Sequence, residues 1–256
     1  MTKTIAVITG ASSGLGKKYV QTLVQDSELE EIWIIARRAD RLTQLQTLDM
    51  GRIIPLSLDL VKEESMTALK SKLENEDVQI RLLINAAGLG KLSTIRKQPL
   101  EQAEQMINLN IKALTEVTSL CLPYMHKGSG ILQIASVASF MPMPGLAVYG
   151  ASKAYVREYS VALRNELKKE GIHVTAVCPY WIEDTEFIAI AENKETTESR
   201  YPFADNTDNV VKKSLKALKK NQAVCTPDPV STIGRIASRL MPETAGARVV
   251  SLFLRD

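Results

Sequence analysis

The sequence has few of the residues that build metal centres or disulfide frameworks. Its 256 residues include three cysteines, Cys121, Cys178 and Cys225, and two histidines, His126 and His173. The cysteines lack C-x-x-C spacing and lie in apolar runs, so we expect small buried side chains and a reducing compartment. The two histidines are far apart in sequence, and we therefore expect no metal site.

Strong charge and long apolar runs are also missing. The formal net charge is +3, too small to indicate a nucleic-acid-binding protein. The lysines within residues 212–220 recur at helical spacing, which is typical of a solvated helix face. No apolar stretch approaches the ~20 residues of a membrane span. A strand-like run begins almost at Met1, which leaves no room for a cleaved signal, so we expect a cytoplasmic protein.

What the sequence does contain is an alternation of strand-like and helical segments. Strand-like runs lie at residues 4–8, 31–36, 52–58, 80–84, 130–135, 173–178 and 222–227, and helical patterns at 17–24, 39–48, 61–73, 100–122 (with a break before Pro123), 149–169 and 210–218. This alternation predicts a single α/β domain over residues 1–256, in which a doubly wound, mostly parallel seven-stranded sheet is flanked by helices. Ligands of such sheets bind beyond the carboxyl ends of the strands.

The first strand-like run leads into a glycine-rich turn, T-G-A-S-S-G-L-G, at residues 9–16. Strand, glycine turn and helix form the layout that binds a nucleotide pyrophosphate, because glycines let the main chain approach the phosphates and the helix start offers free N–H groups. Glycine turns also occur for packing reasons, so this motif alone does not decide the function.

The second strand-like run ends in Ala36-Arg37-Arg38. Folds selective for NAD usually place Asp or Glu at the position of Ala36. The guanidinium of Arg37 matches a 2′-phosphate in charge and geometry. We therefore predict NADP(H) in preference to NAD(H), with Arg37 as the selecting residue, and assign Arg38 and Arg41 to the exposed start of a helix.

Ser136, Tyr149 and Lys153 form the strongest chemical pattern. Tyr149 and Lys153 are four residues apart and share one face of a helix. The ammonium should lower the tyrosine pKa from ~10 toward neutrality and make Tyr149 an acid/base. Ser136 could donate a hydrogen bond to the substrate oxygen. A Y-x-x-x-K pair alone is often a surface pair, but its combination with Ser136 and the glycine turn favours catalysis.

These motifs, together with Asn85-Ala86-Ala87-Gly88 and Asn110, resemble the short-chain dehydrogenase/reductase family over most of residues 1–187. The C-terminal part is similar to the hydroxysteroid-dehydrogenase-like and DltE-like members. The resemblance implies a Rossmann fold, a homodimer or homotetramer, and a catalytic set of Asn110, Ser136, Tyr149 and Lys153. In this set Asn110 would hold a water that relays protons through Lys153, which also bonds the nicotinamide ribose. The implied cofactor-binding residues are Gly10, Ser12, Ser13, Gly14, Leu15, Gly16, Arg37, Asp59, Leu60, Asn85, Ala86, Ala87, Gly88, Tyr149, Lys153, Pro179 and Thr185.

Some of these assignments have competing interpretations. By the resemblance Asp59 accepts from the adenine amino group, but it could instead cap the next helix. Ser13 stands where other NADP-dependent members carry a second basic residue. Pro179 is followed by Tyr180 in place of the usual glycine, and Thr185, the predicted nicotinamide carboxamide ligand, lies one residue further on than usual.

The last third of the sequence is less regular. Residues 182–209 are polar and lack periodicity, so they are either a substrate lid or a plain surface excursion. Residues 228–256 are a C-terminal extension with an amphipathic helix at 230–240, which could pack on its own domain, cover the substrate mouth or touch a membrane. Residues 249–254 could form one more strand. The apolar residues expected near the site are Phe140, Met141, Met143, Tyr180, Trp181 and Phe187.

The sequence therefore predicts an NADP(H)-dependent oxidoreductase. It would interconvert a secondary alcohol and a ketone, or reduce an aldehyde, on an apolar substrate such as a hydroxysteroid. The competing hypothesis is a regulator or sensor that binds NADP(H) with little turnover. Such a protein would not need Ser136, Tyr149 and Lys153 together.

Overall fold

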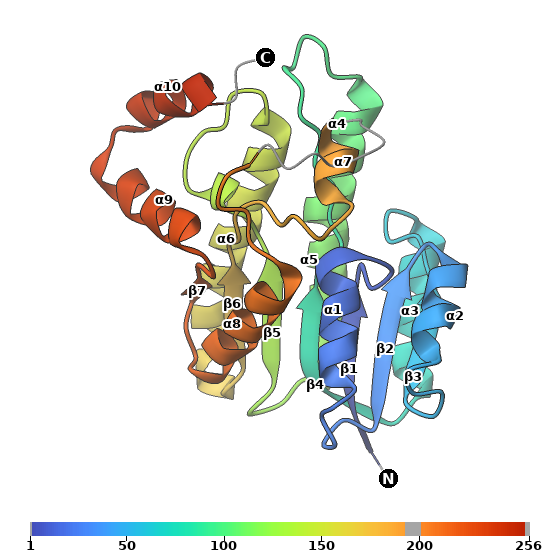
Figure 1. Ribbon diagram of the computed structural model, residues 1–256. Coiled ribbons are helices and arrows are strands. Elements are labelled where there is room, and N and C mark those ends of the chain that lie inside the picture. Colours follow the sequence, from blue (N-terminus) through green and yellow to red (C-terminus); the bar gives the residue numbers. More distant parts are fainter. Residues whose placement is uncertain (1, 193–200, 254–256) are drawn as a thin grey trace.

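In the computed structural model, which describes residues 2–192 and 201–253, seven strands form one sheet in which every neighbouring pair is parallel (Figure 1). Their order is β3-β2-β1-β4-β5-β6-β7, so the winding direction reverses between β1 and β4. The strands are β1 (Lys3–Thr9), β2 (Glu31–Ala36), β3 (Ile53–Ser57), β4 (Val78–Asn85), β5 (Gly130–Ile134), β6 (His173–Val177) and β7 (Val224–Cys225). The predicted doubly wound sheet is confirmed, and it is parallel throughout.

The two edges of the sheet differ from its centre. The central strands are apolar on both faces, as expected where helices cover both sides. At one edge, β3 carries Pro55 in mid-strand, opposite Ile34. At the other edge, β7 has only two residues.

Helices cover both faces of the sheet (Figure 1). One face buries side chains of α1 (Gly14–Leu23), α2 (Ala39–Gln46) and α8 (Thr207–Lys219). The opposite face buries side chains of α3 (Glu63–Asn75), α5 (Leu114–Cys121) and α6 (Ala147–Glu166). The three cysteines are free and buried, as predicted.

The helix predicted over 100–122 is interrupted. It consists of α4 (Leu100–Ile107), a π-helical turn (Asn108–Ala113) and α5, followed by a 3₁₀ turn (Leu122–Tyr124) at Pro123. The π-helical turn contains Asn110. Such turns are rare and occur frequently at functional sites.

The C-terminal part differs from the prediction. After β7 come α9 (Pro229–Leu240) and α10 (Glu243–Phe253). The strand suggested over 249–254 is wrong, because these residues continue α10 as far as 253, and residue 254 lies outside the described part. The segment expected to be irregular contains a short helix, α7 (Phe187–Glu192), while residues 193–200 also lie outside the described part. Within residues 2–192 and 201–253, no helix has the length and apolarity needed to cross a lipid bilayer.

Candidate functional site

A cavity of about 610 Å³ lies beyond the carboxyl ends of the strands, at the point where the winding reverses. Of the predicted site residues, those that line it are Gly10, Ser12, Ser13, Gly14, Leu15, Gly16, Arg37, Asp59, Leu60, Ala86, Ala87, Gly88, Ser136, Tyr149, Lys153, Pro179 and Thr185. The glycine turn and the Tyr149–Lys153 pair therefore share one cavity. Asn85 and Asn110 are not among the lining residues.

The glycine turn connects β1 to α1 through two left-handed residues, Gly10 (φ 68°) and Gly14 (φ 49°). A Cβ atom on Gly10 would lie 2.7 Å from the backbone nitrogen of Ala87, so only glycine lets the turn pack directly on the end of β4. Ser13 is the N-cap residue of α1, but its side chain makes no capping hydrogen bond. The start of α1 therefore faces the cavity with backbone N–H groups suited to an anion.

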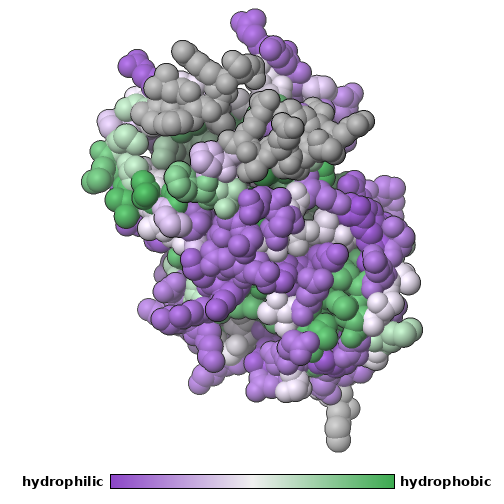
Figure 2. Space-filling model, viewed as in Figure 1, coloured by the Kyte–Doolittle hydropathy of each residue, from purple (hydrophilic) through white to green (hydrophobic). Residues whose placement is uncertain are grey.

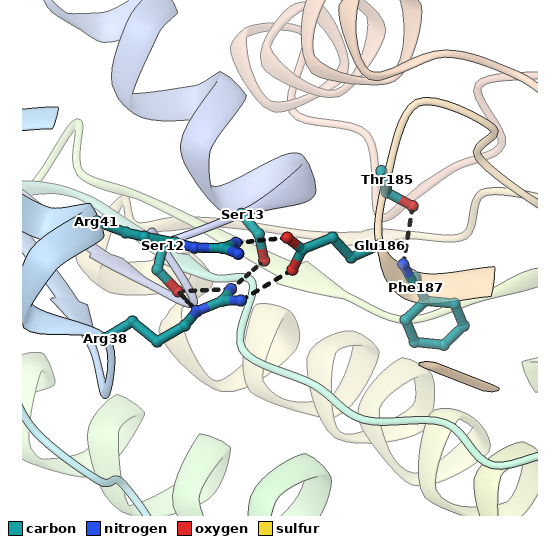
Figure 3. A network of polar contacts seen from close by, with 7 residues as sticks. All are labelled: Ser12, Ser13, Arg38, Arg41, Thr185, Glu186 and Phe187. Carbon is teal, nitrogen blue, oxygen red and sulfur yellow. Dashed lines mark hydrogen bonds and ion pairs between the residues drawn. The ribbon is translucent and has the colours of Figure 1, made fainter. Parts of the chain in front are cut away.

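The hydroxyls of this turn contact Arg38 (Figure 3). Its Nε and Nη2 donate to the Ser12 hydroxyl at 3.1 and 3.0 Å, and its Nη2 donates to Ser13 at 2.8 Å. Arg38 and Arg41 lie at the partly exposed start of α2, as predicted, but the guanidinium of Arg38 also spans the turn and both arginines contact Glu186.

Arg38 also accounts for the serine at position 13. Ser13 stands where a second basic residue was expected, and the guanidinium that reaches its hydroxyl brings positive charge to the same place. Arg37 lines the cavity beside it and is exposed. The role predicted for Arg37 toward a 2′-phosphate stays a prediction, and Arg38 joins it as a residue that the sequence reasoning missed.

Asp59 and Leu60 lie just past the end of β3 and line the same end of the cavity. The competing role of Asp59 as a helix cap is wrong, because α3 begins at Glu63 with Lys62 in the N-cap position. The carboxylate lies at the cavity wall, and its contact with adenine stays a prediction.

The end of β4 lies between the cavity and Asn110. The side chain of Asn85 turns away from the cavity and donates to the Thr118 hydroxyl at 3.0 Å. The buried Asn110 side chain forms two 2.8 Å hydrogen bonds with the backbone of Leu89 and one of 2.9 Å with Ser152. A Cβ on Gly88 would lie 3.2 Å from Lys153 Nζ and 3.4 Å from Asn110 Oδ1, so Asn110 lies directly behind the lining of the cavity. Its part in a proton relay stays a prediction.

Ser136, Tyr149 and Lys153 come together at the end of β5 and the first turns of α6, and all three are buried. The Ser136 hydroxyl lies close enough to the Tyr149 phenol to act on its pKa. Lys153 Nζ lies 5.8 Å from the centroid of the Tyr149 ring and donates to the carbonyl oxygen of Ile134 at 2.7 Å. The predicted catalytic group is thus assembled in space.

The pKa values of this group differ from the sequence prediction. Burial raises the pKa of Tyr149 to about 12, although the neighbouring Ser136 hydroxyl acts in the opposite direction. Burial also lowers the pKa of Lys153 to about 8. The prediction that Lys153 brings the tyrosine pKa toward neutrality is therefore wrong for the chain alone. Removal from water is the largest influence on the pKa of each group.

The loop after β6 places Pro179 and Thr185 along the cavity. The Thr185 hydroxyl donates to the Ile182 carbonyl at 3.0 Å and accepts from the Phe187 N–H at 3.3 Å. A Cβ on Gly14 would lie 3.4 Å from the Thr185 methyl, so this threonine lies over the glycine turn.

Apolar side chains form the other end of the cavity. The rings of Phe187 and Tyr149 have centroids 5.7 Å apart, and those of Phe187 and Trp181 are 6.2 Å apart. Of the apolar residues expected near the site, Met143, Tyr180, Trp181 and Phe187 line the cavity. Phe140 instead lies under the Arg157 guanidinium, and Met141 lies against Gly246 of α10.

The C-terminal helices are attached at this apolar end. The buried Asp228 carboxylate accepts from the N–H groups of Tyr180 at 3.0 Å and Ser231 at 2.7 Å, which ties the loop after β6 to the start of α9. A Cβ on Gly234 would lie 3.1 Å from the methyl of Val137, a cavity-lining residue. α9 therefore packs on its own domain next to the cavity. Its outer face is exposed and apolar (Figure 2), with Ile233, Ile236 and Leu240.

Comparisons with known proteins agree with this architecture. The family model described as short chain dehydrogenase matches residues 4–196. Sulfoacetaldehyde reductase 2 of Chromohalobacter salexigens is 32% identical over 210 residues, 79% of this chain and 82% of that protein. The NADP-dependent 3-hydroxy acid dehydrogenase of Escherichia coli O157:H7 is 32% identical over 186 residues, 72% and 74% of the two chains. A short-chain dehydrogenase from Sphingobium yanoikuyae, solved in complex with NADPH, superposes with a TM-score of 0.78 at 28% identity and covers 98% of this chain and 96% of that one.

Proposed function

Because this chain belongs to the short-chain dehydrogenase/reductase family, we propose that it interconverts a secondary alcohol and a ketone, or reduces an aldehyde, on an apolar substrate. The chain is an NADP(H)-dependent oxidoreductase acting on CH–OH groups. The observation that carries the proposal is that Ser136, Tyr149 and Lys153 line the same cavity as the glycine turn.

The residues of the cavity fit NADP(H). The start of α1 and the glycine turn would hold the pyrophosphate, and Arg37 and Arg38 would hold the 2′-phosphate at the end of β2. Asp59 would accept from the adenine, while Lys153 and Thr185 would hold the nicotinamide end. When bound, the nicotinamide supplies the hydride exchange. The protein therefore needs only to orient the substrate, polarise its oxygen and exchange a proton.

Tyr149 exchanges the proton with the substrate oxygen. With a pKa of about 12, its phenol keeps its proton at neutral pH and can donate it to a carbonyl oxygen as that oxygen gains charge. The Ser136 hydroxyl lines the same cavity as Tyr149 and would donate to the same oxygen. The ammonium of Lys153 adds positive charge close to the phenol. In the direction of carbonyl reduction, these groups would supply the proton and stabilise the charge on the oxygen.

The substrate class follows from the lining of the cavity. Met143, Trp181 and Phe187 surround the space beside Tyr149, which favours an apolar group of moderate size. A hydroxysteroid is one member of this class. The names of the two sequence relatives describe anionic substrates, so sulfoacetaldehyde and 3-hydroxy acids are the comparison compounds for a substrate test.

The experiment measures NADPH oxidation with apolar ketones, aldehydes and these anionic compounds, for the wild type and Tyr149→Phe. Removal of the proton donor should lower turnover by about 10²- to 10⁴-fold while NADPH binding is kept. Tyr155→Phe, on the exposed side of the same helix, is the matched control. Turnover retained in Tyr149→Phe would contradict the role of the phenol. NADPH binding without turnover on any compound would instead support a sensor.

Two further features belong to this proposal. Residues 182–209 would act as a substrate lid, since Ile182, Phe187 and Ile190 line the cavity from the described part of that segment. The extension at 228–256 would form the outer wall of the substrate end. We also expect a homodimer or homotetramer, which light scattering on the purified protein would test.

A further inference from the structure

Glu186 contacts the arginines at the nucleotide end of the cavity. It accepts from Arg38 Nη1 at 2.9 Å and from Arg41 Nη1 at 2.5 Å, one carboxylate oxygen for each arginine (Figure 3). Arg38 and Glu186 are 148 positions apart in the sequence. The contact therefore joins the end of β2 to the segment that precedes α7.

The carboxylate makes the contacts that a phosphate would make. Two guanidiniums share one anion, and Arg38 holds the Ser12 and Ser13 hydroxyls at the same time. Hydrogen bonds from Arg38 and Arg41 lower the pKa of Glu186, so it is charged at neutral pH. The side chains are 38–42% exposed, which makes exchange with a dissolved anion inexpensive.

From this geometry we propose that Glu186 is a specificity-determining residue for the cofactor: its carboxylate, held by Arg38 and Arg41, occupies Arg38 until the 2′-phosphate of the nucleotide replaces it there. The inference rests on the proposed function in one respect, the placement of the 2′-phosphate at the end of β2. A nucleotide without a 2′-phosphate leaves the contact intact. A nucleotide with a 2′-phosphate must break this contact. Its apparent affinity is therefore the intrinsic affinity multiplied by the fraction of molecules in which the contact is already broken.

The same exchange reaches the substrate end of the cavity. Glu186 lies between Thr185, which rests over Gly14, and Phe187, whose ring lies 5.7 Å from that of Tyr149. Trp181 contacts Phe187 from the same segment. Replacement of the carboxylate by a phosphate releases the attachment of this segment at its arginine end. The presence of a 2′-phosphate is thereby transmitted to Trp181 and Phe187.

The test uses adenosine 2′,5′-bisphosphate and adenosine 5′-monophosphate as probes, with binding measured by calorimetry on the full chain. Glu186→Gln keeps the size of the side chain and removes its charge. It should raise the preference for the bisphosphate by about two- to fivefold, the scale for exposed ion pairs. Glu183→Gln, which removes an exposed carboxylate from the same segment, is the control and should leave the preference unchanged.

Suppose that the wild type prefers the bisphosphate and that this preference is unchanged or smaller in Glu186→Gln. This result would overturn the inference about Glu186 and leave the proposed function intact. Equal binding of the two probes by the wild type would overturn the arginine placement itself. Tryptophan fluorescence is the second readout, and the Trp181 signal is taken as the difference between the wild type and Trp181→Phe because the chain also contains Trp33. The bisphosphate should change this signal more than the monophosphate does. Equal changes would refute the link to the substrate end.

Discussion

Replacing Lys153 with methionine should stabilise the folded chain at neutral pH. The lysine is buried, and its pKa is lowered to about 8 from 10.5 by burial. Each pKa unit corresponds to about 1.36 kcal/mol, so keeping this ammonium charged in the interior costs about 3 kcal/mol below pH 8. Methionine fills a similar volume without a charge.

The expected gain is smaller than this figure. The ammonium donates to the Ile134 carbonyl at 2.7 Å, and Lys153→Met leaves that oxygen without its donor. An unpaired buried acceptor costs about 1–3 kcal/mol. We therefore expect a net stabilisation of about 0–2 kcal/mol at pH 7, together with loss of turnover.

The pH dependence gives the sharper test. Between pH 8 and 10.5 the unfolded lysine holds a proton that the folded one has lost, so wild-type stability rises with pH relative to the variant. The difference in the free energy of unfolding between Lys153→Met and the wild type should fall by about 2–3 kcal/mol between pH 8 and 10. Urea unfolding at several pH values measures this difference, and other titrating groups cancel because both proteins carry them.

The matched control is Lys219→Met, which removes an ammonium that is exposed to water in the folded chain as well as in the unfolded one. A stability difference between wild type and Lys153→Met that stays constant from pH 7 to 10 would refute the reasoning. It would mean that Lys153 reaches water or a counter-charge in solution.

Two further predictions concern the backbone around the cavity. Gly10→Ala should unfold at a lower urea concentration and bind NADPH more weakly than Gly145→Ala. Both positions have positive φ, but only a Cβ at Gly10 would meet backbone atoms, at 2.7 Å. Equal losses of stability in the two variants would show that the backbone at Gly10 moves to make room for the Cβ. Asp228→Asn should lower the free energy of unfolding by about 1–3 kcal/mol, because the amide NH₂ would replace the carboxylate oxygen that accepts from the Tyr180 N–H, and two donors would then face each other. Thermal unfolding measures the second change, and an unaltered midpoint would argue against the bridge to α9.

The strands and the residues at their ends could be predicted from the sequence alone. Short apolar runs followed by helical patterns leave few topologies open, and the carboxyl ends of parallel strands meet at one edge. The cavity therefore contains Gly10, Ser136 and Tyr149 together, as expected from their positions after β1, after β5 and in α6.

Other features depend on packing that local patterns do not encode. The contact between Arg38 and Glu186 joins residues 148 positions apart, and neither position carries a signal for the other. The π-helical turn at Asn110 comes from a local shift of the backbone hydrogen bonds to an i→i+5 pattern, which the apolar periodicity of the sequence does not mark. The raised pKa of Tyr149 comes from burial, which includes the ring of Phe187 packed against it. Residues 249–253 have an apolar pattern that suits a strand, yet β7 already ends the sheet and α10 forms instead.

The two margins of the sheet bear on how copies of this chain can associate. Leu58 donates its N–H to Ala36 at 3.0 Å, and since backbone groups alternate along a strand, the nitrogen of Pro55 faces away from β2. A proline there withholds the donor that an incoming strand would need, and the two-residue β7 offers too short a template at the opposite margin. The proline in β3 and the shortness of β7 both disfavour the addition of strands from other chains. Pairing of strands across the sheet edges is therefore an unfavourable way for copies of this chain to associate.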